Sequence, residues 1–210
     1  MQIICFEDDQ VEQLRPIIHA RPAYAISCAS FRLVDWLRSA DGTVSGQVRS
    51  YLQELQRLDF DLESAADFQD SDGVLLVNAR LAPTVKIEAA IKQLAGESRS
   101  VVVVDQQDGA LLMARITAKE IHDSRPESFE QLLALAAGLK TVLDVPLDVF
   151  RWPHDVIAIH MVAMKDALEW RIAHQDHRHP RQQGQCICRY RVRGREPYRH
   201  GQPPAGCRRP

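Results

Sequence analysis

The segment Gly73 to Ala95 constrains the fold of this chain more than any other. Gly73 to Asn78 is a short continuous apolar run behind an acidic turn, which is typical of a central strand covered on both faces. Ala79 to Pro83 follows as its exit loop, and Thr84 is placed to cap a helix over 85–95 whose apolar side chains fall on one side. A strand, a loop and a helix in succession predict a layered α/β domain.

Other segments extend this unit to a mixed sheet with helices on both faces. Further strands are predicted at Ile3 to Phe6, Arg99 to Asp105, Ala110 to Ile116 and, more briefly, Leu147 to Phe150. The turn Gln106 to Gly109 joins two of them as a hairpin. Helices are predicted at Val11 to Leu14, Phe31 to Leu37, Val48 to Leu58 behind a cap at Ser45, Thr117 to His122, Ser128 to Leu139 and Val156 to Arg171.

Charge is distributed unevenly and divides the chain near Trp170. Residues 1–170 hold 16 Lys and Arg against 26 Asp and Glu, whereas residues 171–210 hold 10 against 2. Residues 171–210 also lack Leu and Lys but hold five of the eleven Pro and three of the five Cys. We therefore expect one domain over 1–170, followed by a basic tail over 171–210 that is disordered.

The tail permits three interpretations. Cys186, Cys188 and Cys207, with four nearby histidines, suggest a zinc site, but the CxC spacing does not match the usual paired ligands. The arginines suggest electrostatic binding of nucleic acid, although no aromatic residues are interleaved in order. A gain of Arg, Pro, Gly, Gln and Cys is also what a GC-rich gene yields out of frame, so we hypothesise that the natural frame is lost near residues 174–182.

Composition and cysteine usage predict a cytoplasmic protein without a membrane partner. No apolar run approaches the roughly 20 residues that a membrane-spanning helix needs. The first nine residues lack the basic and apolar regions of a signal peptide. Cys5 and Cys28 lie in apolar surroundings as small core residues, and an odd total of five cysteines fits a reducing compartment.

The segment Leu14 to Ala23 is the first candidate ligand site. It places Arg15 and Arg21 beside two prolines directly after the first predicted strand, where ligands of α/β folds bind. Proline stiffens such a loop, and a guanidinium can make a bidentate contact with a phosphate. Surface ion pairs and a simple helix break remain the alternatives for these residues.

Asn78 and Arg80 form the second candidate site, because they follow the predicted central strand and project into the same crevice. The alternatives are a turn residue and a solvated loop residue. Asp105 and Asp108 are read as hairpin residues rather than metal ligands, and we predict no metal site there. His154 and Asp155 are expected to open the last helix, and His160 to lie at its interface.

Several common catalytic signatures are missing from the chain. It contains no GxGxxG or GxxxxGK[ST] loop, which argues against an ordinary dinucleotide fold or P-loop enzyme. It also contains no GxSxG or HExxH motif.

With these pieces assembled, the chain resembles a family of sugar nucleotidyltransferases similar to the amino-terminal domain of bifunctional UDP-N-acetylglucosamine pyrophosphorylase / glucosamine-1-phosphate acetyltransferase. The order and spacing of four segments over residues 1 to about 170 carry the resemblance. These segments are Ile3 to Asp9, Leu14 to Ala23, Leu75 to Pro83 and Phe150 to Asp155.

The resemblance implies a nucleotidyltransferase-like, Rossmann-like α/β fold, which in that family is usually followed by a β-helix of hexapeptide repeats. We expect that acyltransferase-like half to be absent here, so that the chain is truncated. The implied reaction transfers a nucleotidyl group from a nucleoside triphosphate to a sugar 1-phosphate, with Mg²⁺, and releases pyrophosphate. Arg21 and Arg15 would bind phosphate, while Asn78 and Arg80 would line the sugar or nucleotide side.

The chain departs from better-known relatives in three places. Glu7 to Gln13 stands where they carry a glycine-rich loop, and Ala23 where they carry a lysine. Asn78 and Ala79 stand where they place a metal-binding aspartate. A non-catalytic nucleotide-sugar-binding or regulatory module on the same fold is therefore the second hypothesis, and nucleic-acid binding through the tail is the third.

Overall fold

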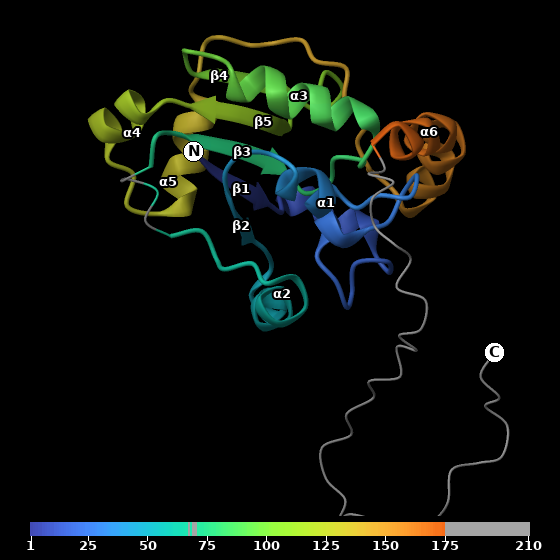
Figure 1. The fold of residues 1–210 in the computed structure, drawn as a ribbon. Helices are drawn as coiled ribbons and strands as arrows, with labels where there is room; N and C mark the ends of the chain where they lie inside the picture. The colour runs from blue at the N-terminus through green and yellow to red at the C-terminus, as the bar shows by residue number, and fades with distance from the viewer. Residues whose placement is uncertain (67, 69–70, 175–210) are drawn as a thin grey trace, which may run out of the picture. The chain divides into compact units, whose positions relative to one another are not determined.

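The computed structural model describes residues 1–66, 68 and 71–174, and shows a five-stranded mixed sheet (Figure 1). The strand order is β2-β1-β3-β5-β4. The strands are β1 (Gln2–Phe6), β2 (Thr43–Gln47), β3 (Val74–Asn78), β4 (Val101–Val104) and β5 (Leu111–Ile116).

The sheet joins a parallel half to an antiparallel hairpin. β1 pairs in parallel with β2 and with β3, and β5 pairs antiparallel with both β3 and β4. All five residues of β3 are buried, as its apolar run predicts. Because two antiparallel pairings separate β3 from β4, these two strands point the same way. The carboxyl ends of β1, β2, β3 and β4 therefore meet at one edge of the sheet.

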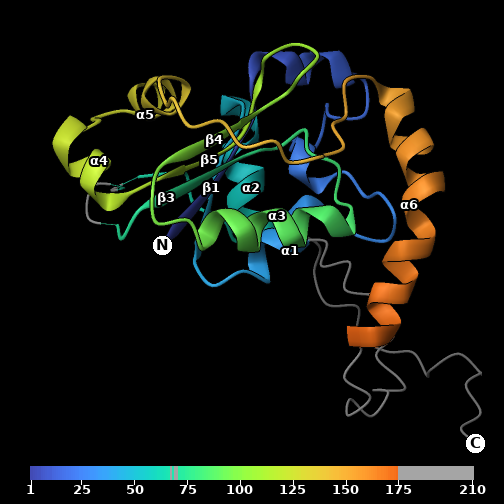
Figure 2. The same ribbon diagram turned by 90° about the horizontal axis from the view of Figure 1, so that it is seen from above.

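Helices cover both faces, which confirms the predicted layered α/β fold. Figure 2 shows α1 and α3 on one side of the sheet and α5 on the other. Ile87 and Leu94 of α3 join the core of the first face, and Leu132 of α5 joins the core of the second. The helices are α1 (Leu33–Arg38), α2 (Gln53–Phe60), α3 (Val85–Ala95), α4 (Ala118–Ser124), α5 (Phe129–Ala137) and α6 (Pro153–His174).

Two of the predicted elements are wrong. Ser45 does not cap a helix, because it lies inside β2, and the helix begins only at Gln53. Leu58, the last residue of the predicted helix, is 65% exposed. Residues 147–150 form no strand, and only Val149 makes an isolated bridge, with Leu81.

Three short 3-10 turns complete the loops on the carboxyl side of the sheet. They are Asp9–Leu14, Ala23–Ala25 and Ser50–Leu52. The first fulfils the prediction of a helical turn before the proline segment. Thr84 occupies the residue before α3 as expected, but its hydroxyl lies 3.4 Å from the Asp148 carboxylate instead of capping the helix.

The cysteines of the domain are core residues, as predicted. Cys5 and Cys28 are both free and buried. Burial, and then the charge of Glu7, raises the pKa of Cys5, while burial and then Asp148 raise the pKa of Cys28 to about 11. Both side chains therefore remain thiols at neutral pH.

Helix α6 runs to His174, four residues past the boundary that charge alone suggests. The tail predictions from residue 175 onward lie outside the described residues. No helix of the described part is long and apolar enough to cross a membrane.

Gly46 in β2 packs closely against the side chain of Gln56 in α2. Gln56 is fully buried beneath it, donates to the Gly46 carbonyl at 3.0 Å and accepts from the Tyr24 hydroxyl at 3.2 Å. A methyl group at Gly46 would overlap the Gln56 amide. We expect Gly46→Ala to lower the free energy of unfolding by about 1–3 kcal/mol, measured by urea denaturation.

Gly138→Ala is the matched control for that substitution. Gly138 follows α5 with φ −79°, and a methyl group there would meet its nearest neighbours at 3.5 Å. This variant should be as stable as the parent or slightly more stable. Equal stability of both variants would contradict the overlap at Gly46.

Candidate functional site

Polar side chains gather where four strands end at the same edge of the sheet. Glu7 and Asp8 follow β1, Arg49 follows β2, and Asp105 follows β4. β3 ends at Asn78, with Arg80 two residues later. In open α/β sheets ligands bind outside the carboxyl ends of the strands, so this edge is the candidate site.

Asp8, Asn78 and Arg80 form a closed network at the centre of the edge. The Arg80 guanidinium donates from Nε and Nη2 to the two Asp8 oxygens, at 2.8 and 2.7 Å. Asn78 Nδ2 donates to Asp8 at 2.8 Å and to the Leu111 carbonyl at 2.9 Å. Asn78 Oδ1 accepts the Arg80 backbone N–H at 2.9 Å. The network ties β1, β3 and β5 together at the edge.

Burial decides what these two predicted site residues can do. Asn78 and Arg80 are both 0% exposed, whereas the Asp8 side chain retains 20% exposure. A guanidinium without solvent contact that already pairs with a carboxylate is not available to a phosphate. The structure thus brings Asn78 and Arg80 together, as positioning residues behind Asp8.

Glu7 and Arg49 form a second network that fixes the arginine-proline loop. Their side chains are 2% and 13% exposed, and Arg49 Nε lies 3.0 Å from Glu7 Oε2. Arg49 Nη2 donates to the carbonyls of Ile18 and Arg21, at 3.0 and 3.2 Å. Glu7 Oε1 accepts the Ala23 N–H at 2.8 Å. Leu14 to Ala23 is therefore held at its carboxyl end by a buried ion pair.

The two loop arginines lie apart from the central network. Arg15 is exposed and pairs with Glu12 within the same turn. Arg21 is exposed and lines a cavity of about 300 Å³ with Ser27, Arg32 and Phe60 among others. No described residue makes an ion pair or a hydrogen bond with the Arg21 guanidinium. Of the four predicted site residues, Arg21 alone presents an unpaired cation within the described part.

A larger cavity, of about 650 Å³, lies at the end of β4. Asp105 and Arg151 form an ion pair on its wall, with side chains 5% and 28% exposed. Gln106 and Gln107 add amides to a lining that also includes Leu112, Val149 and Ile159. The Arg151 Nε is buried without a partner, so this guanidinium retains a free donor.

The turn and helix residues behave as the sequence predicts. Asp105 Oδ1 accepts the Gln107 N–H and Asp108 Oδ1 accepts the Ala110 N–H, both at 2.9 Å, which is hairpin chemistry. Asp155 accepts the N–H groups of Arg151 and Trp152 at 2.8 Å, at the start of α6. His160 Nδ1 accepts the Ala29 N–H at 3.1 Å, an interface contact.

Sequence reasoning missed Arg49, Arg151 and the role of Glu7. Arg49 lies inside the segment predicted as a helix from Val48, so the sequence gives no sign that it follows a strand. For Arg151 the sequence does contain a signal. This residue lies between a predicted strand and the predicted start of the last helix, and a cation at such a position can reach the edge of the sheet. For Glu7 the sequence indicates only that it belongs to the acidic end of the first strand.

The comparisons with known proteins agree with the predicted family. A family model described as sugar nucleotidyl transferase matches residues 3–175. No curated protein matches the chain at a significant level.

Among solved structures, one assigned as a glucose-1-phosphate thymidylyltransferase from Bacillus anthracis, in complex with sucrose, has 8% identity and a TM-score of 0.47. The matched region covers 78% of this chain and 94% of the chain in that structure. A 4-diphosphocytidyl-2C-methyl-D-erythritol synthase has 9% identity and a TM-score of 0.42, covering 77% and 98%. A third, the corresponding synthase from Anaerococcus prevotii, has 8% identity and a TM-score of 0.44, covering 77% and 97%.

The family match spans nearly the whole described domain, from β1 to the end of α6. The chain therefore belongs to the sugar nucleotidyl transferase family, whose reaction is nucleotidyl transfer to sugar phosphates.

Proposed function

We propose that this chain transfers a nucleotidyl group from a nucleoside triphosphate to a sugar 1-phosphate at the carboxyl edge of the sheet. A phosphate oxygen of the sugar would attack the α-phosphorus of the triphosphate, and pyrophosphate would leave. Such chemistry depends on positioning and charge neutralisation rather than on a protein nucleophile. The observation that carries the proposal is the unpaired Arg21 guanidinium on a loop fixed by Glu7 and Arg49.

The triphosphate is assigned to the Arg21 side of the edge. Arg32 lines the same cavity, where it pairs with Asp35 through Nε and Nη2 at 3.1 and 2.7 Å. The hydrogen bond that Arg32 donates to the Asp35 carboxylate raises the pKa of Arg32, so this group stays charged. Arg15, on the same loop, would add a cation after leaving its exposed pair with Glu12, which is a weak contact.

The sugar phosphate is assigned to the cavity beside Arg151. Sugar hydroxyls need mixed donors and acceptors, and the two glutamine amides and the nearby carboxylates supply both. The Arg151 guanidinium, 28% exposed beside Asp105, would donate to the phosphate. Asn78 and Arg80 would lie between the triphosphate and the sugar phosphate, where they would fix Asp8 and the ends of the central strands.

Enzymes of this family generally use a divalent metal, and the carboxylates at the edge are the groups that would have to hold it. Both Asp8 oxygens accept from Arg80, and Asn78 shares one of them. Asp105 is engaged by Arg151 and the Gln107 N–H. Within the described residues no group of three His, Cys, Asp or Glu could hold a metal. These residues do not fit a Mg²⁺ site, and no step is derived through the ion.

A second function, binding of a nucleotide sugar without catalysis, is favoured by the same pairing. Asn78, an amide, ends β3, and the neighbouring carboxylates of Asp8 and Asp105 are neutralised by arginines. A binding or regulatory module requires the Arg21 guanidinium but no metal ion. Nucleic-acid binding through the basic tail ranks third, because it rests on residues outside the described part.

UTP with N-acetylglucosamine 1-phosphate is the first substrate pair to test, since the sequence resemblance points to UDP-N-acetylglucosamine. A pyrophosphate-release assay with several triphosphates and sugar 1-phosphates separates the two functions. Turnover supports the transferase, whereas binding of the nucleotide sugar without turnover supports the module. The proposal includes a cytoplasmic location, which the free thiols of Cys5 and Cys28 support.

Arg21→Ala should weaken nucleotide binding roughly 10- to 100-fold, because a charge-assisted contact to phosphate contributes about 1.5–3 kcal/mol. Isothermal titration calorimetry with UTP measures the change. Arg99→Ala is the matched control, since Arg99 is also exposed but precedes β4 at the opposite edge. Equal affinities in the two variants would remove Arg21 from the site.

A further inference from the structure

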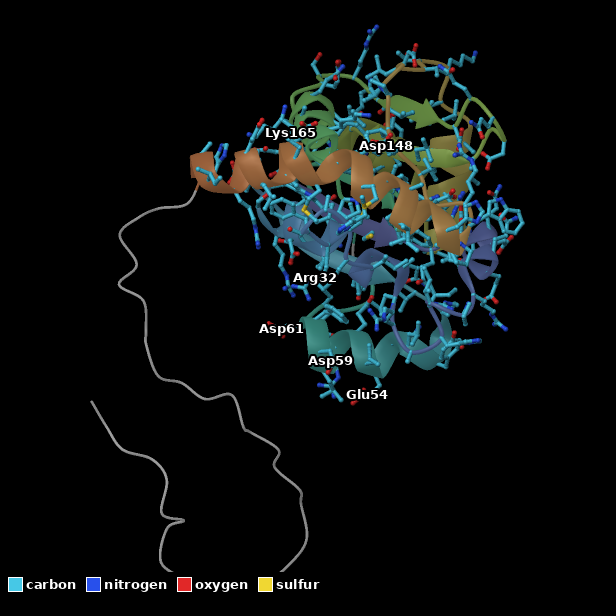
Figure 3. The ribbon with its side chains drawn as sticks, turned by 90° about the vertical axis from the view of Figure 1, so that its right-hand side faces the viewer. Arg32, Glu54, Asp59, Asp61, Asp148 and Lys165 are labelled. Atoms are coloured by element: carbon cyan, nitrogen blue, oxygen red, sulfur yellow. The ribbon has the colours of Figure 1, made fainter. Side chains whose placement is uncertain are left out.

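Helix α6 carries a row of exposed apolar side chains, Ile157, Met161, Leu168 and Ile172, here called the α6 stripe. They are 69%, 73%, 46% and 67% exposed. An α-helix turns about 100° per residue, so all four fall within about 60° of one another around the axis. Figure 3 shows α6 lying across the side of the domain that faces the viewer.

The opposite face of α6 attaches the helix to the domain. His160 accepts the Ala29 N–H, and the Trp170 indole donates to Glu88 of α3 at 2.6 Å. Ala167 is fully buried, and Trp170 packs against Phe31 with ring centroids 5.4 Å apart. The domain therefore fixes α6 through one face and leaves the α6 stripe uncovered by described residues.

The spacing of the α6 stripe is the same in both directions along the helix. The intervals between its residues are 4, 7 and 4. If a second α6 lies antiparallel, with a twofold axis between Met164 and Lys165, Ile157 faces the partner's Ile172. Met161 then faces the partner's Leu168. A twofold interface requires one patch that complements itself, and this spacing meets that requirement.

The area of the α6 stripe is that of a weak dimer. Each copy offers four large aliphatic or thioether side chains, since Val162, although 82% exposed, lies about 110° around the axis from the centre of the stripe. At about 100 Å² each the four supply on the order of 400 Å² per copy, or about 800 Å² for the pair. An interface of this size fits a dimer that forms only at micromolar concentrations or above.

We propose that α6 is a homodimer interface, in which two copies of this chain pair antiparallel through the α6 stripe. Lys165 lies close to the twofold axis, where it would approach its own counterpart. Its ammonium lies 3.9 Å from Glu169 of the same helix, so a carboxylate offsets that charge. An apolar centre bordered by charged residues is the usual anatomy of such an interface.

Sedimentation of the full chain at tens of micromolar tests the proposal. The parent should sediment as a dimer, and Met161→Glu with Ile172→Glu should halve the mass. Leu58→Glu is the matched control, because Leu58 is 65% exposed on α2 and should leave the dimer intact. A monomeric parent, or a dimer that persists in the double variant with an unchanged circular dichroism spectrum, overturns the proposal.

Disulfide cross-linking tests the antiparallel arrangement. In a background with Cys186, Cys188 and Cys207 changed to Ser, Lys165→Cys should form a cross-linked dimer on mild oxidation. Ile157→Cys should not, since the two copies of residue 157 would lie about 22 Å apart along the helices, beyond the reach of a disulfide. Cross-linking of Ile157→Cys without Lys165→Cys would overturn the antiparallel pairing.

Discussion

Arg80→Ala should lower the free energy of unfolding by about 3–5 kcal/mol, the expected effect of removing one partner of a buried ion pair. The Arg80 side chain is 0% exposed and donates to both Asp8 oxygens, so its loss leaves a carboxylate without its cation. The Asn78 amide alone then faces that charge. Urea denaturation followed by circular dichroism measures the change.

A paired substitution separates the lost ion pair from lost packing. Arg80→Met keeps much of the aliphatic volume, and combining it with Asp8→Asn removes the stranded charge. This double variant should recover at least half of the stability lost in Arg80→Met alone, because the penalty comes from the uncompensated carboxylate. If the double variant instead loses the sum of what Arg80→Met and Asp8→Asn lose separately, the network contributes only packing.

Glu7→Ala should have the second large effect, on both stability and binding. The Glu7 carboxylate is 2% exposed and accepts from the N–H groups of Ala23 and Arg49 and from Arg49 Nε, so its removal leaves three donors without this acceptor. We expect a loss of about 3–5 kcal/mol in stability. Nucleotide affinity should fall at least about tenfold, because a loop that must be ordered on binding binds less tightly.

Two further variants complete the Glu7 test. Glu7→Gln retains an acceptor for Ala23 and should fall between the parent and Glu7→Ala in both measurements. Glu12→Ala removes a carboxylate that is 45% exposed, and should change stability by no more than about 1 kcal/mol. If Glu7→Ala lowers stability but leaves UTP binding unchanged at 10 °C, the loop is not part of the nucleotide site.

The elements predicted best are those whose local pattern agrees with their tertiary setting. α3 matches its predicted bounds and β3 begins one residue later than predicted, since an apolar run and a one-sided helix leave few alternatives. β2 was missed because Thr43–Gln47 contains Ser and Gly, and only pairing with β1 and the buried Gln56 makes it a strand. Long-range pairing overrode local propensity there.

The site was predicted in place but not in detail. Sequence position puts Asn78 and Arg80 at the carboxyl edge, and both are there. It cannot reveal that Asp8, some 70 residues earlier, occupies their donors. Nor does it reveal that Arg49 holds the loop that carries Arg21. Such pairings arise only when strands distant in sequence become neighbours.

The strand order also sets the width of the carboxyl edge of the sheet. β3 and β5 lie between β1 and β4, and neighbouring strands are about 4.8 Å apart, so the ends of β1 and β4 are separated by about 14 Å. A ligand that contacts the residues following both strands at once must span about that distance, as a compound made of two joined halves can.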